Sequence, residues 1–185
     1  AIEGRHRHVA IVEPGIPWIY HPAFAWTSNP IRTIPQGNGD CVWPRPHATQ
    51  VMGTILSVDA TDRGLAPAAW AAAGASCSLK TSDLIATAEK VVDASHLVLN
   101  FSWGSRFAAG HLKVQDRYAD LLTVRLLRNV VASAGNTGNS WWQSEQFVYS
   151  PASSYNTVAV GAFDDRGTAQ RGDDVVADFS GWRNP

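Results

Sequence analysis

Short, continuously apolar segments alternate with helix-like segments along this chain, and this alternation constrains the fold more than any other feature. The first apolar run, residues 8–12, stops at Pro14-Gly15, and comparable runs follow at 69–75, 97–101 and 130–134. Strands that are apolar throughout, rather than at every second position, are typical of a parallel sheet covered on both faces. The sequence therefore predicts an α/β fold: a mostly parallel, doubly wound sheet with helices on both faces.

Three helices are expected between these runs, because apolar side chains recur there at helical spacing. One begins near Pro46, one runs from Thr81 or Ser82 to Val92, and one spans 111–128. Thr81 or Ser82 is expected to cap the second helix, since a hydroxyl can accept from a free N–H of the first turn.

The remaining segments are expected to be a loop and two more strands. Residues 16–46 contain six prolines and the turn signal Gly37-Asn38-Gly39, with little periodicity, so a loop is predicted there. Strands are predicted at 157–162 and 175–179, after a loop that carries tryptophans.

Composition places the chain among globular proteins and disfavours several classes of partner. Its 185 residues, 45% hydrophobic and 17% charged, suffice for one compact domain or a large piece of one. The formal net charge is −1 and no basic block is present, so we expect no nucleic-acid partner. No apolar run approaches the roughly 18 residues that a membrane helix needs, so we expect no membrane partner.

The metal-ligating residue types form no framework in the sequence. Cys41 and Cys77 allow one disulfide, but two free buried thiols are an equally good interpretation. His6 and His8 alternate as residues on one strand face do and could share a metal. A pair without further ligands is too little, so no metal site is expected.

Polar residues follow directly on predicted strands, where the ligand crevice of a parallel sheet lies. Glu13 ends the first strand, Ser102 and Trp103 follow the run 97–101, and Asn136 follows 130–134. His47 opens the helix near Pro46; taken alone it could be a helix-terminal histidine bonded to backbone. An acid, an imidazole and an amide donor in this order are the parts that a serine hydrolase on such a sheet needs.

Several segments resemble, in one order, the motifs of the subtilisin-like serine peptidases, the subtilases. The segment 46–55 resembles the family's His-Gly-Thr-His-Val-Ala-Gly-Thr motif, and 9–16 resembles the strand that ends in Asp-Thr-Gly or Asp-Ser-Gly. Residues 99–104 resemble Asn-Met-Ser-Leu-Gly, and 130–138 resemble Val-Ala-Ala-Ala-Gly-Asn-Asp-Gly. Other stretches that match the family in the same order are Gly64–Ala69, Ser150–Tyr155, Val158–Ala162 and Ala177–Ser180. The resemblance covers residues 9–180.

The resemblance implies catalytic roles for three residues. His47 would take the proton from the nucleophile, Glu13 would orient the imidazole, and the Asn136 amide would donate to the oxyanion. Asn136 could instead be a loop residue that tolerates a left-handed turn before Gly138.

The resemblance also implies a substrate-binding edge. Ser102, Trp103 and Gly104 would offer main-chain hydrogen bonds to an extended peptide. Trp103 could instead be an ordinary packing residue. If it flanks the first specificity pocket, its bulk would favour substrates with small side chains before the scissile bond.

The chain departs from the family pattern at the residues that matter for catalysis. Glu13 stands where the family has Asp, Ala48 replaces a glycine, and Gln50 replaces the second histidine. The family's nucleophile lies downstream in a Gly-Thr-Ser-Met-Ala-like motif, and no serine of this chain lies in such a motif. Two interpretations follow: a portion of a serine endopeptidase domain that lacks the nucleophilic Ser, or a catalytically inactive pseudopeptidase that binds peptides. A nucleotide-binding alternative is weak, because no GxGxxG follows the first strand.

The remaining expectations also come from the resemblance. We expect 9–185 to be an incomplete peptidase domain, and 1–8 an N-terminal extension whose start, Ala-Ile-Glu-Gly-Arg, looks like a protease-site remnant. The chain alone is expected to be inactive, with a polypeptide substrate and a C-terminal partner chain that completes the domain. No cofactor is expected; the family often binds structural calcium, but no acidic loop here has a convincing ligand spacing. Secretion is the family tendency.

Overall fold

The structure is a computed structural model that describes residues 3–25, 27, 29–36, 41, 43–93, 96–106, 111–139, 141 and 146–183. The chain divides into two compact units, Ala1–Ser102 and Trp103–Pro185. In the part of the chain that is described, no helix is long and apolar enough to cross a membrane.

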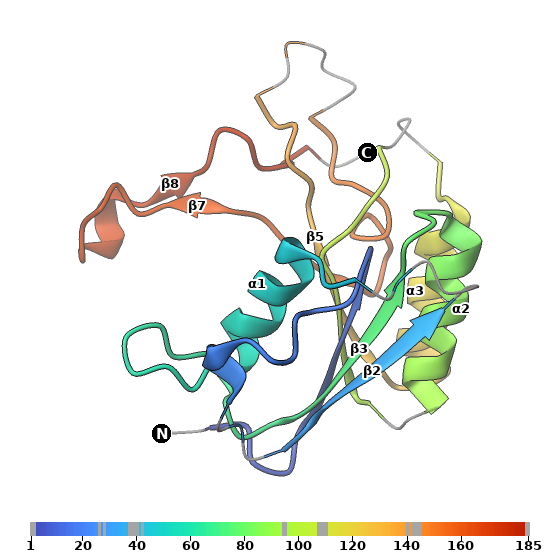
Figure 1. The fold of residues 1–185 in the computed structure, drawn as a ribbon. Helices are drawn as coiled ribbons and strands as arrows, with labels where there is room; N and C mark the ends of the chain where they lie inside the picture. Colours follow the sequence, from blue (N-terminus) through green and yellow to red (C-terminus); the bar gives the residue numbers. More distant parts are fainter. Residues whose placement is uncertain are drawn as a thin grey trace. The chain divides into compact units, whose positions relative to one another are not determined.

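The first unit is built on parallel strands (Figure 1). These are β1 (His8–Glu13), β2 (Ile31–Gln36), β3 (Trp70–Ser76) and β4 (Val98–Phe101), in the spatial order β2-β3-β1-β4. Each neighbouring pair runs in parallel. The carboxyl end of β1, which carries Glu13, therefore lies between those of β3 and β4.

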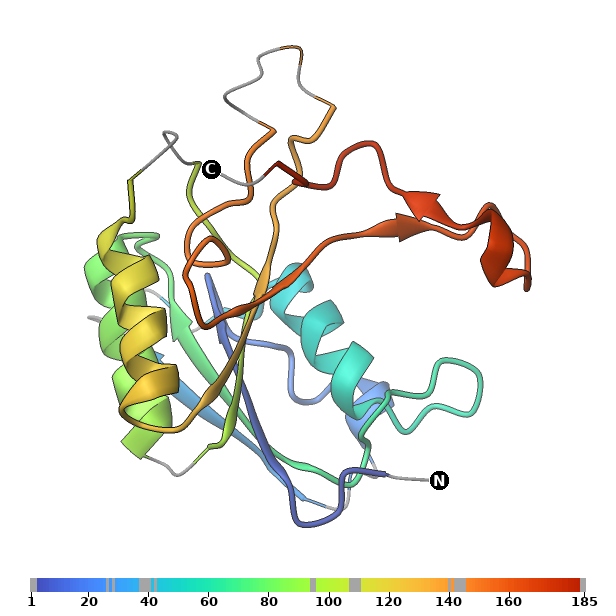
Figure 2. The ribbon, with the colours of Figure 1, turned by 180° about the vertical axis from the view of Figure 1, so that it is seen from behind.

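Helix α1 (Pro46–Leu56) covers one face of this sheet, as Figures 1 and 2 show. Met52 and Leu56 of the helix are fully buried and share one core cluster with Ile11 of β1 and Ala73 of β3. The helix starts where it was predicted, because Pro46 takes its first position, where no N–H partner is needed.

Helix α2 (Thr81–Asp93) packs on the opposite face (Figure 2). A Cβ at Gly74 of β3 would lie 2.7 Å from methyl groups of Thr87 and Val91, so the helix approaches the sheet closely only because this residue is glycine. The prediction that Thr81 or Ser82 caps this helix is wrong. The carbonyl of Lys80 already accepts the N–H of Leu84, so the capping position precedes Thr81.

A loop was predicted for the segment 16–46, but this segment also contains the 3-10 helix η1 (Pro22–Phe24) and the strand β2. β2 pairs only with β3, so it is an edge strand, where a proline such as Pro35 is tolerated. The prolines and the low periodicity gave no local signal for this strand, which is stabilised by pairing with β3.

A disulfide joins Cys41 to Cys77, beyond the ends of β2 and β3. The cysteines are therefore bridged, and the alternative of two free buried thiols is wrong.

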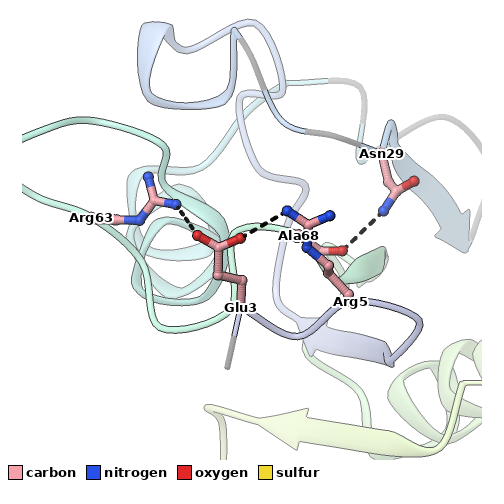
Figure 3. A network of polar contacts seen from close by, with 5 residues as sticks. All are labelled: Glu3, Arg5, Asn29, Arg63 and Ala68. Carbon is pink, nitrogen blue, oxygen red and sulfur yellow. Dashed lines mark hydrogen bonds and ion pairs between the residues drawn. The ribbon is translucent and has the colours of Figure 1, made fainter. Parts of the chain in front are cut away.

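The amino-terminal segment is tied to the first unit by polar contacts (Figure 3). Glu3 accepts hydrogen bonds from Arg63 at 2.9 Å and Arg5 at 3.4 Å, and these arginines hold its pKa below the ordinary value of 4.5.

The expectation that His6 and His8 share a strand face is wrong. His6 lies in a turn with a φ of 59°, and β1 begins only at His8.

The described part of the second unit contains a parallel pair of strands, an antiparallel pair and an α-helix. The strands β5 (Asn129–Ser133) and β6 (Val158–Val160) run in parallel. α3 (Val114–Val124) is shorter than the predicted 111–128. It begins late because the buried Asp116 accepts the N–H of Lys113 at 2.7 Å, which caps the first turn.

The prediction of a strand at 175–179 is wrong in length. β8 (Val175–Val176) has two residues and pairs in an antiparallel ladder with β7 (Phe163–Asp164). The strand stops because the chain turns: Ser180 donates its N–H to the carbonyl of Ala177. A 3-10 helix, η3 (Arg171–Asp173), lies between β7 and β8. With parallel strands and helices on both faces of the first sheet, the α/β fold class is confirmed.

Candidate active site

Glu13 and His47 are in direct contact. Oε2 of Glu13 lies 3.0 Å from Nδ1 of His47. Glu13 has no exposed surface, whereas the His47 side chain is 61% exposed. The expectation that this glutamate reaches the histidine, despite being one methylene longer than the aspartate of the family pattern, is confirmed.

The loop after β1 holds the start of α1 in place. Arg45, the residue before the helix, donates its N–H to the carbonyl of Ile16 at 2.8 Å, and Trp18 donates its N–H to Oγ1 of Thr49 at 2.8 Å. Gly15 permits this approach: its φ is 130°, and a Cβ there would lie 2.1 Å from Cγ of Arg45. These contacts bring the first turn of α1, with His47, over the end of β1.

Ser102 lies on the other side of Glu13. β4 runs beside β1 with Phe101 opposite Val12, so the residues that follow them, Ser102 and Glu13, are neighbours. The Ser102 hydroxyl accepts from the Asn100 side chain at 2.7 Å. The sequence-based placement of Ser102 at the same sheet end as Glu13 is thus confirmed.

Two opposing effects act on the Glu13 carboxyl. Burial raises its pKa above the ordinary value of 4.5, because desolvation disfavours the charged form. The charge and hydrogen bond of His47, and the backbone and hydroxyl of Ser102, lower the pKa by a smaller amount. Glu13 therefore holds a proton more readily than an exposed glutamate does.

The arrangement can perform general base chemistry. When Nδ1–H of His47 donates to Glu13, the neutral imidazole has its Nε2 free to accept a proton. Because the side chain is mostly exposed, that nitrogen is accessible to a reacting group.

Asn136 lies in the second unit, just after β5, and is exposed. The left-handed conformation next to it is taken by Gly135, with a φ of 97°, and Asn136 is not among the residues with positive φ. The alternative that Asn136 is there to allow a left-handed turn is therefore wrong. Its role as an oxyanion donor stays a prediction, as do the roles of Glu13 and His47.

The predicted substrate edge is only partly open. Gly104 is exposed and Trp103 is half-buried. Directly after them, Ser105 pairs with Ser150 through two backbone hydrogen bonds of 2.9 and 3.2 Å. Any peptide that pairs with this edge must therefore do so before Ser105.

Sequence reasoning missed Tyr149, whose side chain lies against both Gly104 and Gly135. The residue precedes the segment 150–155 that carried the family resemblance, and no local pattern singled it out. Its contacts with two glycines that are 31 residues apart in the sequence exist only in the folded chain.

A cavity of about 880 Å³ lies along α1 in the first unit. Trp18 and Phe24 line it from the loop after β1, Gly53 and Thr54 from the helix, and Leu65 from the loop after the helix. Among the described residues, no group of three or more His, Cys, Asp or Glu side chains is placed to hold a metal ion.

Solved structures similar to this one include proteases. The prenylagaramide maturation protease PagA is 25% identical with a TM-score of 0.72, over 95% of this chain and 58% of that chain. The self-cleaved protease domain of PatA is 25% identical with a TM-score of 0.73, over 97% of this chain and 64% of that one. The PatG macrocyclase in complex with peptide, at 13% identity, shows likeness of fold alone, with a TM-score of 0.75 over 100% of this chain and 64% of that one.

The chain thus spans 58–64% of the length of these three structures. No curated protein matches its sequence. Residues 8–183 match the model of the Subtilase family. Because this match covers nearly all of the chain, the chain belongs to the subtilase family.

Proposed function

We propose that this chain is the part of a subtilisin-like serine endopeptidase domain that supplies the general base, its orienting acid and the oxyanion donor. The observation that carries the proposal is the 3.0 Å contact between Nδ1 of His47 and the buried carboxylate of Glu13. PagA and PatA, two similar structures at 25% identity, are described as a maturation protease and a protease domain.

Each residue then has a defined task. His47 takes the proton of the serine hydroxyl through Nε2 and returns it to the leaving amine. Glu13 holds the imidazole in the right tautomer and stabilises the imidazolium ion. Asn136 donates to the tetrahedral oxyanion, a contact worth about 3–4 kcal/mol in comparable sites.

The nucleophilic serine comes from a downstream segment of the same protein, which docks on the first unit along α1. A serine that reaches Nε2 of His47 must lie near the start of this helix. The cavity of about 880 Å³ along the helix, with Trp18, Phe24 and Leu65 in its walls, offers an apolar site for such a segment. More than a third of the length of PagA, PatA and PatG has no counterpart in this chain, so those structures contain enough further sequence to fill it.

Location outside the cell is part of the same proposal. The disulfide between Cys41 and Cys77 supports it, because such bonds persist in oxidising compartments.

A pseudopeptidase that binds peptides without cleaving them is the second candidate. Glu13 in place of the family's aspartate favours it. The two candidates share the peptide groove and differ in whether a nucleophile reaches His47.

An active-site phosphonate probe separates the two candidates. The protein as its gene encodes it, with all residues downstream of this chain, should be labelled on one serine and should degrade unfolded casein. Both signals should disappear in His47→Ala, and the present chain alone should not be labelled. Full-length protein that binds peptides but is never labelled would instead establish the pseudopeptidase.

A further inference from the structure

The ring of Tyr149 lies between two glycines of the second unit. A Cβ built on Gly135 would lie 2.6 Å from Cγ and Cδ1 of Tyr149. A Cβ built on Gly104 would lie 3.0 Å from its Cβ and 3.3 Å from its Cδ2. The ring therefore occupies the space that any side chain at Gly104 or Gly135 would need.

Tyr149 is held at both its backbone and its hydroxyl. Its N–H donates to the carbonyl of Ala134 at 3.0 Å, and its hydroxyl is 3.0 Å from Oγ1 of Thr137. The next residue, Ser150, is joined to Ser105 by backbone bonds in both directions. The backbone bonds fix where the side chain starts, and the ring cannot swing away without breaking its bond to Thr137.

The two glycines belong to the two segments that a substrate contacts under the proposed function. Gly104 ends the predicted substrate edge, and Gly135 directly precedes the predicted oxyanion donor, Asn136. A peptide residue whose backbone paired with the edge before Ser105, and whose carbonyl oxygen met Asn136, would direct its side chain toward the space between these segments. The Tyr149 ring lies between Gly104 and Gly135 of the same two segments.

We propose that Tyr149 determines specificity by filling the pocket for the residue before the scissile bond, so that only small side chains such as glycine, alanine or serine fit there. This inference rests on the proposed function, because it uses the substrate edge and the oxyanion donor. It deepens that function by naming the substrate class. Close packing explains the effect: a pocket filled by an aromatic ring has no room for a second large side chain.

Trp103 is the competing explanation for the same preference. It lies in the substrate edge and is half-buried. The two residues are distinguished by replacing each in turn, since only the residue that fills the pocket should open it when truncated.

The test measures the binding of two labelled peptides that differ only in alanine or phenylalanine before the scissile bond. Fluorescence anisotropy is measured on full-length protein that carries His47→Ala in every form, so that the peptides are bound and not cleaved; wild type then refers to residues 103 and 149. Wild type should bind the alanine peptide at least about 10-fold more tightly, which is the scale on which hydrophobic pockets discriminate by size. In Tyr149→Ala this preference should fall to within about 3-fold or reverse, because the removed ring leaves room for phenylalanine.

Matched variants control the result. Tyr149→Phe keeps the ring and loses only the bond to Thr137, so its preference should match wild type. Tyr155→Ala removes a tyrosine that is 82% exposed and should change nothing. Tyr149→Val leaves a smaller cavity and should shift the preference in the same direction as Tyr149→Ala. If circular dichroism shows that Tyr149→Ala is unfolded, Tyr149→Val is used in its place.

The outcomes separate the inference from the proposed function. If wild type binds neither peptide, the proposed peptide groove fails, and the role of Tyr149 fails with it. If wild type binds both peptides equally, or if Trp103→Ala relaxes the preference while Tyr149→Ala and Tyr149→Val do not, the groove stands and the role of Tyr149 is overturned.

Discussion

Nδ1 of His47 lies 3.0 Å from Oε2 of Glu13, so that an exposed imidazole is anchored on a carboxylate with no exposed surface. The glutamate is buried below, and the ring lies where other molecules can reach it. A buried carboxylate that holds an exposed imidazole suits a general base, because Nδ1 must be fixed in orientation while Nε2 reacts.

Replacing Glu13 tests whether this contact serves catalysis. In the full-length protein, Glu13→Gln keeps the shape of the side chain but removes the charge that stabilises the imidazolium ion. Turnover of a peptide substrate should fall on the order of 10⁴-fold, as loss of an orienting carboxylate does in serine proteases, with peptide binding nearly unchanged. Glu3→Gln removes a carboxylate that pairs with Arg63 and should leave turnover as it is. Unaltered turnover in Glu13→Gln would show that Glu13 is not the triad acid.

The raised pKa of Glu13 predicts a specific dependence of stability on pH. Below the ordinary pKa of 4.5 the carboxyl is protonated in both the folded and the unfolded chain, so its contribution is fully present. As pH rises from there through the higher pKa of the folded chain, the unfolded chain releases the proton first and the folded chain loses stability. Above that folded pKa the contribution is constant.

Urea denaturation from about pH 4 to about pH 8, for wild type and Glu13→Gln, measures this component as the difference between the two curves. Wild type should lose stability relative to the variant as pH rises above 4.5. A difference that grows in the opposite direction would mean that the contact with His47 outweighs burial.

Gly15 is expected to be the glycine on which the site geometry depends. Gly15→Ala places a Cβ within 2.1 Å of Arg45 at a φ of 130°, so the start of α1 must shift away from Glu13. Unfolding free energy should fall by at least about 1–3 kcal/mol, the cost of one strained backbone residue. In the full-length protein, turnover should fall as well.

Gly53→Ala is the matched control, because a Cβ there meets nothing within 4 Å and alanine favours the helix. It should raise the stability of the present chain by roughly 0.5–1 kcal/mol. If Gly15→Ala also proved neutral or stabilising, the loop after β1 would not position α1.

The cavity along α1 should be needed for docking of the nucleophile segment. Gly53→Trp fills part of it from the helix, since a Cβ at this residue meets nothing within 4 Å and the residue lines the cavity. The variant should keep the circular dichroism spectrum of wild type, and the full-length protein carrying it should lose phosphonate labelling. Full labelling of that variant would place the docking surface elsewhere.

Local patterns allowed most of the fold to be predicted. β1, β3 and β4 were predicted within one residue at each end, because continuous burial makes their residues apolar whatever lies beside them, and the start of α1 was predicted at Pro46. β2 was not, because an edge strand with a proline is stabilised by its neighbour β3 and carries a weak local signal. The strand expected at 175–179 failed for the opposite reason: its local signal was adequate, but the chain turns at Ala177.

The sequence by itself determined the fold class, the family and the order of Glu13, His47 and Asn136 along the chain. These follow from residue types at fixed spacing, which do not require knowledge of any distant contact. Only the tertiary structure decided that Glu13 reaches His47, that Cys41 is bonded to Cys77, and that Tyr149 lies between Gly104 and Gly135. Each of these depends on two segments far apart in the sequence meeting within a few ångströms, and that distance is set by the packing of the whole chain rather than by any local pattern.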